Sequence, residues 1–269
     1  QMCIRDSCMK VQVLVACMNQ SDFSIVKRSN IQTDAVIVNQ CDKDEIHEFD
    51  FQNAQDKICH VKFINTTERG LSRSRNMAIY NATADLCLIC DDDEVLDSNY
   101  ETTIVQGFTS HPNCDIIAFK LDFDEITFSD KEYNVNKWNA GRIASVQIAF
   151  RNNNLIRSTP FNIKMGSGTG NGCGEENKFL LDCLKKRVQI KYIPSDNIAR
   201  ISTEGSLWFK GYTPEYWINR GWIAKMLYGK FWGVFYIVYQ ILFRVKKRDN
   251  FHYRIHILNW FIKGFKENR

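Results

Sequence analysis

Three consecutive carboxylates, Asp91, Asp92 and Asp93, directly follow a short apolar run over residues 86–90. Carboxylates a few ångströms apart repel one another and raise each other's pKa unless a cation lies among them. Oxygen ligands suit Mg²⁺ or Mn²⁺, which proteins often hold with one or two carboxylates together with substrate phosphates. A solvated acidic turn would have the same composition. The place of the triplet after a strand, where open α/β sheets bind ligands, favours a metal and phosphate site.

An acid pair, Glu175 and Glu176, follows a segment with a glycine at every second position from Gly166 to Gly174. A carboxylate whose pKa is raised by burial or by a second carboxylate is a suitable general base for a hydroxyl group. Two glutamates at a helix start also complement the helix dipole, without any catalytic role. The glycines fit no phosphate-loop or dinucleotide pattern, so we expect either a mobile loop that closes over substrate or a flexible linker.

Two arginines, Arg73 and Arg75, lie in the segment 70–76 at an expected helix start. Free backbone amides and the dipole favour anions there, and arginine can neutralise a phosphate or hold a carboxylate. Either arginine could instead be a surface residue. Cys87 and Cys90 have the spacing of a metal or redox pair, but residues three apart in a strand point to opposite faces. We therefore expect both cysteines to be buried structural residues.

Short apolar runs alternate with helix patterns, which predicts an α/β fold with a mostly parallel sheet. The expected strands cover residues 11–16, 35–38, 58–64, 86–90, 115–121, 143–150 and 190–193. The expected helices cover residues 21–31, 73–81 with Ser72 as cap, 98–108 and 175–186. Thr213 and Pro214 mark a further helix start, because proline is favoured at the first helical position after a capping residue.

The 269 residues are enough for one large domain with an appendage. We expect residues 1–8 to be extraneous, residues 9–206 to form the α/β domain, and residues 207–269 to form a helical appendage. The sequence has no pattern of a charged start, a long apolar core and a small-residue cleavage site. A cytoplasmic location is therefore the expectation.

Charge is distributed unevenly along the chain. The formal net charge is +4, but residues 207–269 contain twelve Lys and Arg and three Asp and Glu, together with five of the six tryptophans. Aromatic and basic side chains are typical of a membrane interface with anionic lipid. The apolar run 231–243 is shorter than the roughly 20 residues that span a bilayer. We expect peripheral membrane contact, with a tryptophan-rich soluble subdomain or a protein interface as alternatives; the basic residues form no exposed stripe that would favour nucleic acid.

In combination, these motifs resemble the inverting glycosyltransferases of family two, which have a GT-A fold. The resemblance covers roughly residues 9–206. The matching segments are Cys17–Met18–Asn19, Asn39 to Asp42, Gly70 to Asn76, Asp91 to Asp93, and Gly174–Glu175–Glu176–Asn177.

The resemblance implies a sugar-nucleotide site over the carboxyl ends of the first strands. Asp91 would contact the ribose and, with Asp93, reach a Mn²⁺ or Mg²⁺ ion, and Asp92 would lie in the same donor site. Arg200 stands where the family often has a histidine near the metal. The remaining implied donor contacts are Cys17, Asn19, Asn39 or Asp42 at the base and ribose, and Arg73 or Arg75 at the base or pyrophosphate.

The resemblance also implies that Glu176 is the base and that Glu175 contacts the acceptor. We therefore expect transfer with inversion, from a nucleotide-sugar donor such as a UDP-sugar to a saccharide or lipid-linked acceptor at the inner face of the cell membrane. A nucleotidyltransferase that forms a sugar nucleotide is one alternative, although Cys17–Met18–Asn19 is no glycine-rich loop. A catalytically silent, membrane-docked nucleotide-binding protein is the other.

Overall fold

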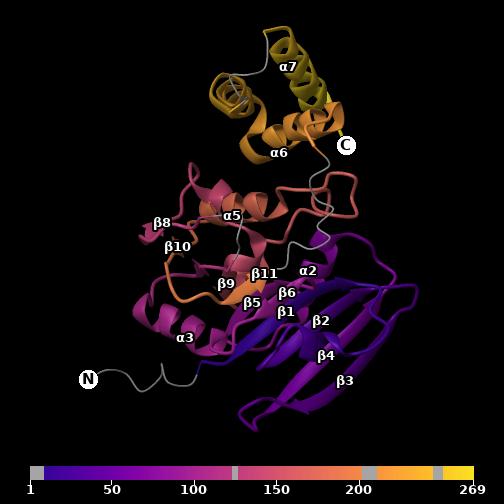
Figure 1. Ribbon diagram of the computed structural model, residues 1–269, viewed down its shortest axis with the longest axis vertical. Coiled ribbons are helices and arrows are strands. Elements are labelled where there is room, and N and C mark those ends of the chain that lie inside the picture. The colour runs from indigo at the N-terminus through magenta and orange to yellow at the C-terminus, as the bar shows by residue number, and fades with distance from the viewer. Residues whose placement is uncertain (1–8, 123–126, 202–210, 245–250) are drawn as a thin grey trace.

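The computed structural model describes residues 9–122, 127–201, 211–244 and 251–269, so residues 1–8 and the expected domain boundary at residue 206 lie outside the described part. A nine-stranded sheet has the order β3-β4-β2-β1-β5-β9-β7-β10-β8, and helices lie against it (Figure 1). The strands are β1 Val11–Met18, β2 Asp34–Gln40, β3 Glu45–Gln52, β4 Ile58–Thr66, β5 Leu86–Asp91, β7 Ile116–Ala118, β8 Tyr133–Asn134, β9 Ile148–Arg151 and β10 Ile190–Tyr192; β6 Glu94–Leu96 and β11 Ala199–Ile201 form a separate two-stranded sheet.

Six strands of the large sheet (β1, β2, β4, β5, β7 and β10) run in one direction, which confirms the expected mostly parallel α/β fold. The three others run against them. A strand was expected over residues 143–150; β9 covers residues 148–151 and lies between β5 and β7. β3 was not expected. It pairs with β4 at the sheet edge, where its mostly exposed polar side chains give no strong hydrophobic signal.

The two faces of the sheet are covered by different helices. Successive side chains of β1 point to opposite faces of the sheet, because Leu14 packs in one hydrophobic cluster whereas Val13 and Val15 pack in the other. Cys87 and Cys90 are likewise buried on opposite faces with free thiols, as the spacing predicted. One cluster contains residues of α2 (Leu71–Asn81) and α5 (Glu175–Lys185), and the other contains residues of α1 (Ile25–Arg28) and α3 (Tyr100–Ser110); α4 (Asn154–Arg157) is a single short turn.

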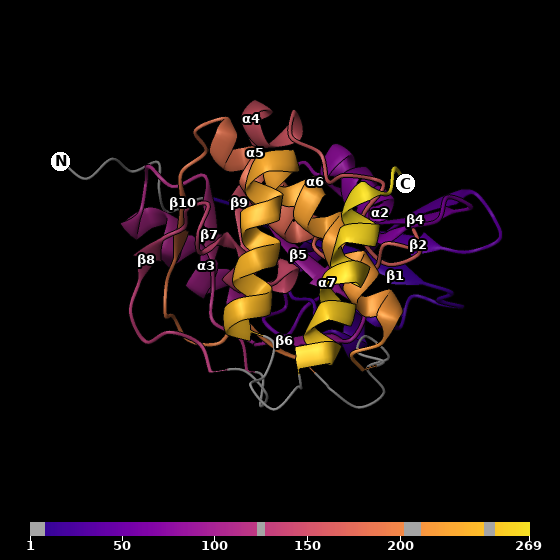
Figure 2. The ribbon, with the colours of Figure 1, turned by 90° about the horizontal axis from the view of Figure 1, so that it is seen from above.

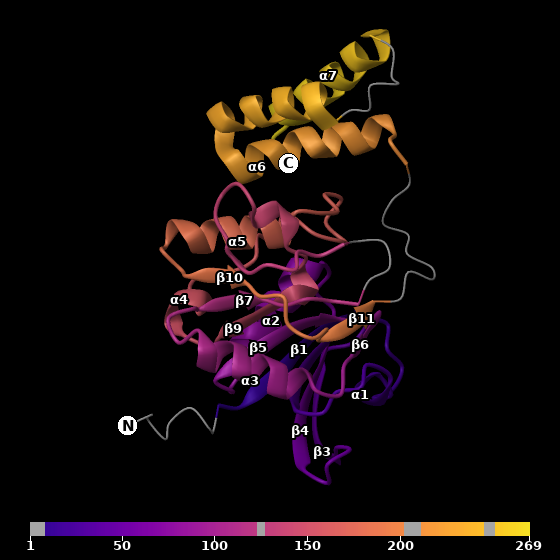
Figure 3. The same cartoon turned by 60° about the vertical axis from the view of Figure 1, so that its left-hand side comes forward.

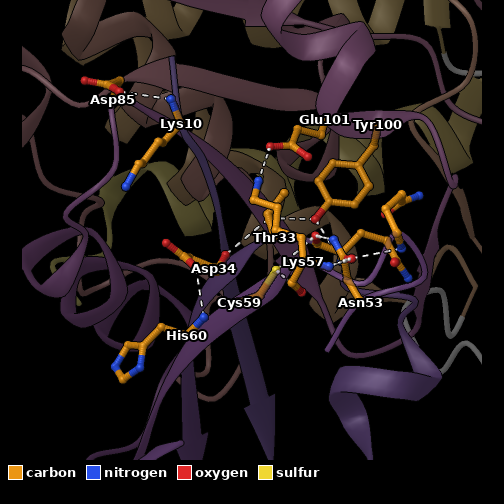
Figure 4. A network of polar contacts seen from close by, with 12 residues as sticks. Lys10, Thr33, Asp34, Asn53, Lys57, Cys59, His60, Asp85, Tyr100 and Glu101 are labelled. Carbon is orange, nitrogen blue, oxygen red and sulfur yellow. Dashed lines mark hydrogen bonds and ion pairs between the residues drawn. The ribbon is translucent and has the colours of Figure 1, made fainter. Parts of the chain in front are cut away.

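A polar network stabilises the amino ends of the strands, opposite the expected site (Figure 4). The hydroxyls of Thr33 and Tyr100 lie 2.7 Å apart. Lys57 forms an ion pair with Glu101 of α3 at 3.2 Å, and the amide of Lys10 donates to Asp85 at 2.9 Å. These bonds connect α3 and the starts of neighbouring strands at the edge of the sheet opposite the acid triplet.

Two C-terminal helices form a layer above this domain (Figures 2 and 3). They are α6 (Pro214–Tyr239), continued by a π-helical turn over Gln240–Arg244, and α7 (Phe251–Lys266). Thr213 caps α6 by accepting from the amide of Tyr216, and Pro214 opens the helix, as expected. Gly229, with φ 74° and ψ −175°, bends α6 sharply, which the sequence pattern did not predict.

The first half of α6 belongs to the core of the α/β domain. Trp222, Ile223 and Leu227 pack in the same cluster as Phe161 and Phe179. The two C-terminal helices also pack a small cluster between themselves, which includes Trp217, Ile257 and Phe261, so the appendage both has a core of its own and shares the core of the α/β domain.

Candidate functional site

The acid triplet lies at the carboxyl end of the central parallel strands. Asp91 is the last residue of β5, and its Cα is in register with Ala16 of β1. Asp92 and Asp93 form the turn into β6. β6 pairs with β11 so that Arg200 lies opposite Val95. The segment that contains Arg200 therefore lies beside the triplet, as the family resemblance implied. The Arg200 side chain itself is mostly exposed, and its Nε lies 3.7 Å from Oδ2 of Asp122.

Arg75 connects the two acid clusters that the sequence analysis treated separately. Its Nη2 donates to both carboxylate oxygens of Asp91, at 2.8 and 2.9 Å, and to Oγ of Ser145. Its Nη1 donates to Oε1 of Glu175 at 3.0 Å. The Arg75 side chain is only 2% exposed. Burial alone would lower the pKa of Arg75, but Asp91 and Glu175 raise it above its usual value, so this guanidinium is charged.

Asp92 and Asp93 are more accessible than Arg75. The carboxylate of Asp92 accepts from the amide of Met18 at 3.4 Å and from Nε2 of Gln20 at 3.3 Å. Burial, followed by the charge of Asp91, raises the pKa of Asp92. Burial, followed by the charges of Asp91 and Asp92, raises the pKa of Asp93. Since these carboxylates repel one another, a cation beside Asp93 would relieve an unfavourable interaction.

The donor set fits a hard divalent cation only in part. Within the described residues, no group of three or more His, Cys, Asp or Glu side chains is placed to hold a metal. Asp91 already faces Arg75, and Asp92 accepts hydrogen bonds from Met18 and Gln20, which leaves Asp93 as the most exposed carboxylate of the triplet. A Mg²⁺ or Mn²⁺ ion often takes few protein ligands and completes its shell with water and phosphate oxygens.

Glu94 is a further residue of the site, which the sequence analysis missed. It is 2% exposed, and its Oε1 accepts from the amide of Asp91 at 3.0 Å. Burial and the charge of Asp91 raise the pKa of Glu94 well above its usual value. The side chain thus holds the backbone of the triplet. In the sequence, Glu94 is a fourth acid directly after three acids, and this pattern predicts only a longer exposed turn.

The acid pair begins α5, directly after Gly174, whose φ of 86° is the left-handed conformation that glycine adopts without strain. Glu175 is buried against Arg75. Glu176 is less buried, and burial together with the charge of Glu175 raises its pKa to about 8. A carboxyl group with such a pKa exchanges its proton near neutral pH, as a general base must.

The polar side chains at the carboxyl ends of β1 and β2 form hydrogen bonds with neighbouring residues of the protein. The buried thiol of Cys17 donates to the carbonyl oxygen of Val38 at 3.5 Å, and burial raises its pKa far above the usual value. Asn39 is fully buried and donates to Asn65 at 2.7 Å and to the carbonyl of Gln20 at 3.0 Å. Asn19 has a left-handed backbone, with φ 54°. Cys17 and Asn39 thus bond to neighbouring protein groups at the carboxyl ends of β1 and β2.

Arg73 and Asp42 lie apart from Arg75. Asp42 is almost fully exposed and pairs with Arg69 at 2.6 Å. Arg73 lines a cavity of about 560 Å³ together with Arg69, and the remaining lining residues are Ile163, Lys164, Gly168, Thr169, Gly170, Asn171 and Arg269. The two arginines of the 70–76 segment therefore have different environments. Arg73 is exposed at a basic cavity beside the glycine-rich loop, whereas Arg75 is buried between carboxylates.

The glycine-rich loop packs over the start of α2. A Cβ on Gly166 would lie 3.3 Å from Oγ of Ser72 and 3.4 Å from the carboxyl carbon of Glu175, and one on Gly168 would lie 3.2 Å from Cα of Gly70. Ser72 does not cap α2. Its hydroxyl donates to the carbonyl of Met165, so it ties the helix to the loop, and Gly70 takes the cap position. This loop thus closes one side of the site next to the acid pair.

Comparisons with known proteins agree with this architecture. The family model of glycosyl transferase family 2 matches residues 17–171. S. aureus TarS 1–349 in complex with UDP-GlcNAc superposes with a TM-score of 0.62 at 16% identity, covering 95% of this chain and 81% of that one. The mannosyltransferase PcManGT from Pyrobaculum calidifontis, in complex with GDP-Man and Mn²⁺, gives a TM-score of 0.52 at 12% identity, covering 95% and 74%. A search of the curated proteins gives no match.

The family match extends over more than half of the chain and includes the carboxyl ends of β1, β2 and β5, Arg75 and the acid triplet. The acid pair of α5 begins four residues after the end of the match, and Glu175 contacts the matched part through Arg75. This chain is a glycosyltransferase of family 2 with a GT-A-like α/β fold.

Proposed function

We propose that this glycosyltransferase moves a sugar with inversion from a nucleotide-sugar donor, a UDP-sugar in the first instance, to a hydroxyl of a saccharide or lipid-linked acceptor. The observation that carries the proposal is the buried Arg75, which bonds to Asp91 on the donor side and to Glu175 on the acceptor side. The UDP-GlcNAc and GDP-Man complexes of the two similar structures support a nucleotide-sugar donor.

In this reaction, Glu176 accepts the proton of the acceptor hydroxyl as its oxygen attacks the anomeric carbon. The bond between that carbon and the phosphate oxygen breaks, and the nucleoside diphosphate leaves with the electron pair. Arg75 keeps Asp91 and Glu175 in place on either side of the reacting groups, which lowers the entropic cost of the encounter. No covalent enzyme intermediate forms.

Asp93 would hold a divalent cation, Mn²⁺ or Mg²⁺, for which the repulsion within the triplet provides the favourable site. A bound cation supplies charge stabilisation for the departing diphosphate. We place the reaction at the cytoplasmic face of the cell membrane, in bacterial polysaccharide or glycolipid synthesis, because the α6–α7 layer has the aromatic and basic composition of a membrane interface.

A thermal-shift titration with UDP, with and without Mn²⁺, tests the donor site on the wild type, on Asp93→Ala and on the matched control Asp130→Ala, an exposed aspartate outside the site. We expect UDP to stabilise the wild type and Asp130→Ala only with the metal, and Asp93→Ala not at all. No response of the wild type to any nucleoside diphosphate would contradict the proposal. Pyrophosphate release from a nucleoside triphosphate and a sugar phosphate would instead identify a nucleotidyltransferase.

A further inference from the structure

The second half of α6 exposes a continuous apolar surface. Its exposed side chains include Phe231 at 67%, Phe235 at 55% and Phe243 at 71%. We call this surface the aromatic face; its residues are Phe231, Trp232, Val234, Phe235, Val238, Tyr239, Leu242 and Phe243. A soluble protein rarely exposes so many large apolar side chains together unless they contact a partner or a membrane.

The aromatic face continues onto the α/β domain. Trp138, in the turn between β8 and the 3-10 helix Ala140–Arg142, is 75% exposed. Its ring lies edge-on to that of Trp232, with the centroids 6.5 Å apart. Nζ of Lys137 lies 4.8 Å from the Trp138 ring centroid and 5.9 Å from that of Trp232. Two segments far apart in the sequence thus build one surface.

Charge and length indicate which partner covers this surface. The sequence has no acidic residue between Lys230 and Arg244, and Lys137 places a cation beside the rings of Trp138 and Trp232. Anionic lipid headgroups attract such cations, while tryptophan and tyrosine rings favour headgroup depth. The straight piece over residues 230–243 would be about 21 Å long at 1.5 Å per residue. This is less than the roughly 30 Å hydrocarbon core of a bilayer, so the piece suits a position along the interface.

The other half of α6 cannot join the second half in the lipid. By length and apolar composition alone, residues 214–243 could cross a membrane. However, Trp222, Ile223 and Leu227 are buried in the core of the α/β domain, and Gly229 bends the helix between the two halves.

We propose that the aromatic face and the Lys137–Trp138 turn together form a docking surface for an anionic lipid bilayer. The turn is also tied to the helix of the candidate base, because Nδ2 of Asn177 donates to the carbonyl oxygens of Ile143 at 3.3 Å and of Ala140 at 3.5 Å. Asn177 directly follows Glu176. Docking therefore fixes the distance between the bilayer and the reacting groups, a consequence that rests on the proposed function, whereas the lipid contact itself does not.

Cosedimentation of the full chain with phosphatidylcholine vesicles, with and without phosphatidylglycerol, tests the proposal. We expect the wild type to bind the anionic vesicles, and Trp138→Ala and Phe235→Ala each to bind roughly tenfold more weakly, the loss that removing one large buried apolar side chain produces. Tyr80→Ala removes an aromatic side chain that is 81% exposed on α2 and should bind like the wild type. Circular dichroism melting checks that each variant is folded.

Lys137→Glu adds a test of the electrostatic part, because it should weaken binding to anionic vesicles and leave any weak binding to neutral vesicles unchanged. Wild-type-like vesicle binding by Trp138→Ala would overturn the composite surface. If the wild type does not bind vesicles but is a dimer by light scattering, and Trp138→Ala is a monomer, a second copy of the chain covers the aromatic face. UDP titration of the same proteins separates the two proposals. A wild type that binds UDP but does not bind anionic vesicles would contradict the docking surface and leave the proposed donor site unaffected.

Discussion

At the scale of single residues, the site depends on one buried guanidinium between carboxylates. Removing Arg75 leaves Asp91 and Glu175 without their shared partner in a largely buried place. Breaking a buried ion pair by removing one partner costs about 3–5 kcal/mol. We expect Arg75→Met to lower the free energy of unfolding by that amount in urea titrations, and to abolish transfer.

The double variant Arg75→Met/Glu175→Gln is the control, because it also removes one of the unpaired charges and should recover part of the lost stability. Equal stability of Arg75→Met and the wild type would show that these carboxylates do not need the arginine.

The pKa of Glu176 gives a prediction for the pH dependence of transfer. In the proposed mechanism Glu176 must be ionised to accept a proton, and its pKa is raised to about 8, so kcat/KM should rise with pH and level off above that value. Glu176→Gln should lower the rate about 10²–10⁴-fold, the usual contribution of a general base, and the residual rate should lose this ascending limb. Rates measured between pH 5.5 and 9.5, with UDP affinity as the control for intact donor binding, test both statements. A variant that keeps full activity would show that another group takes the proton.

At the scale of elements, the carboxyl ends of separate strands lie side by side for a physical reason. Parallel strands end at the same edge of a sheet, so β1, β2 and β5 bring their following residues together. The sequence did not predict that Arg73 is exposed whereas Arg75 is buried. Residues two apart on a helix point in nearly opposite directions, and only the packing decides which side is buried. Glu94 and the antiparallel β9 also depend on contacts that no local pattern encodes.

The crossing of α6 and α7 depends on glycines. A Cβ on Gly264 would lie 1.8 Å from the carbonyl oxygen of Ile218, and one on Gly221 would lie 2.0 Å from that of Phe261. We expect Gly264→Val to lower stability by about 1–3 kcal/mol or more, because overpacking forces the helices apart. Gly141→Ala is a matched control, since a Cβ there has open space. Equal melting temperatures of the two variants would contradict this contact.

At the scale of the whole molecule, the C-terminal layer and the α/β domain should unfold together. Trp222 is 1% exposed in a cluster that also contains Phe179 of α5 and Ile89 of β5. Trp222→Ala should cost about 3–5 kcal/mol, as large-to-small changes of buried aromatic residues do. Scanning calorimetry should show a single transition that moves to lower temperature. Two separate transitions, of which only one moves, would mean that the layer is an independent unit.

The bend at Gly229 also divides the apolar length of α6. A straight helix over residues 214–243 would be about 45 Å long, more than enough to cross the hydrocarbon region. With φ at 74°, one residue divides that length into a piece that completes a protein core and a piece that faces outward. Under the docking proposal, this single backbone torsion separates the piece that would lie along the bilayer from the piece that stays in the protein core.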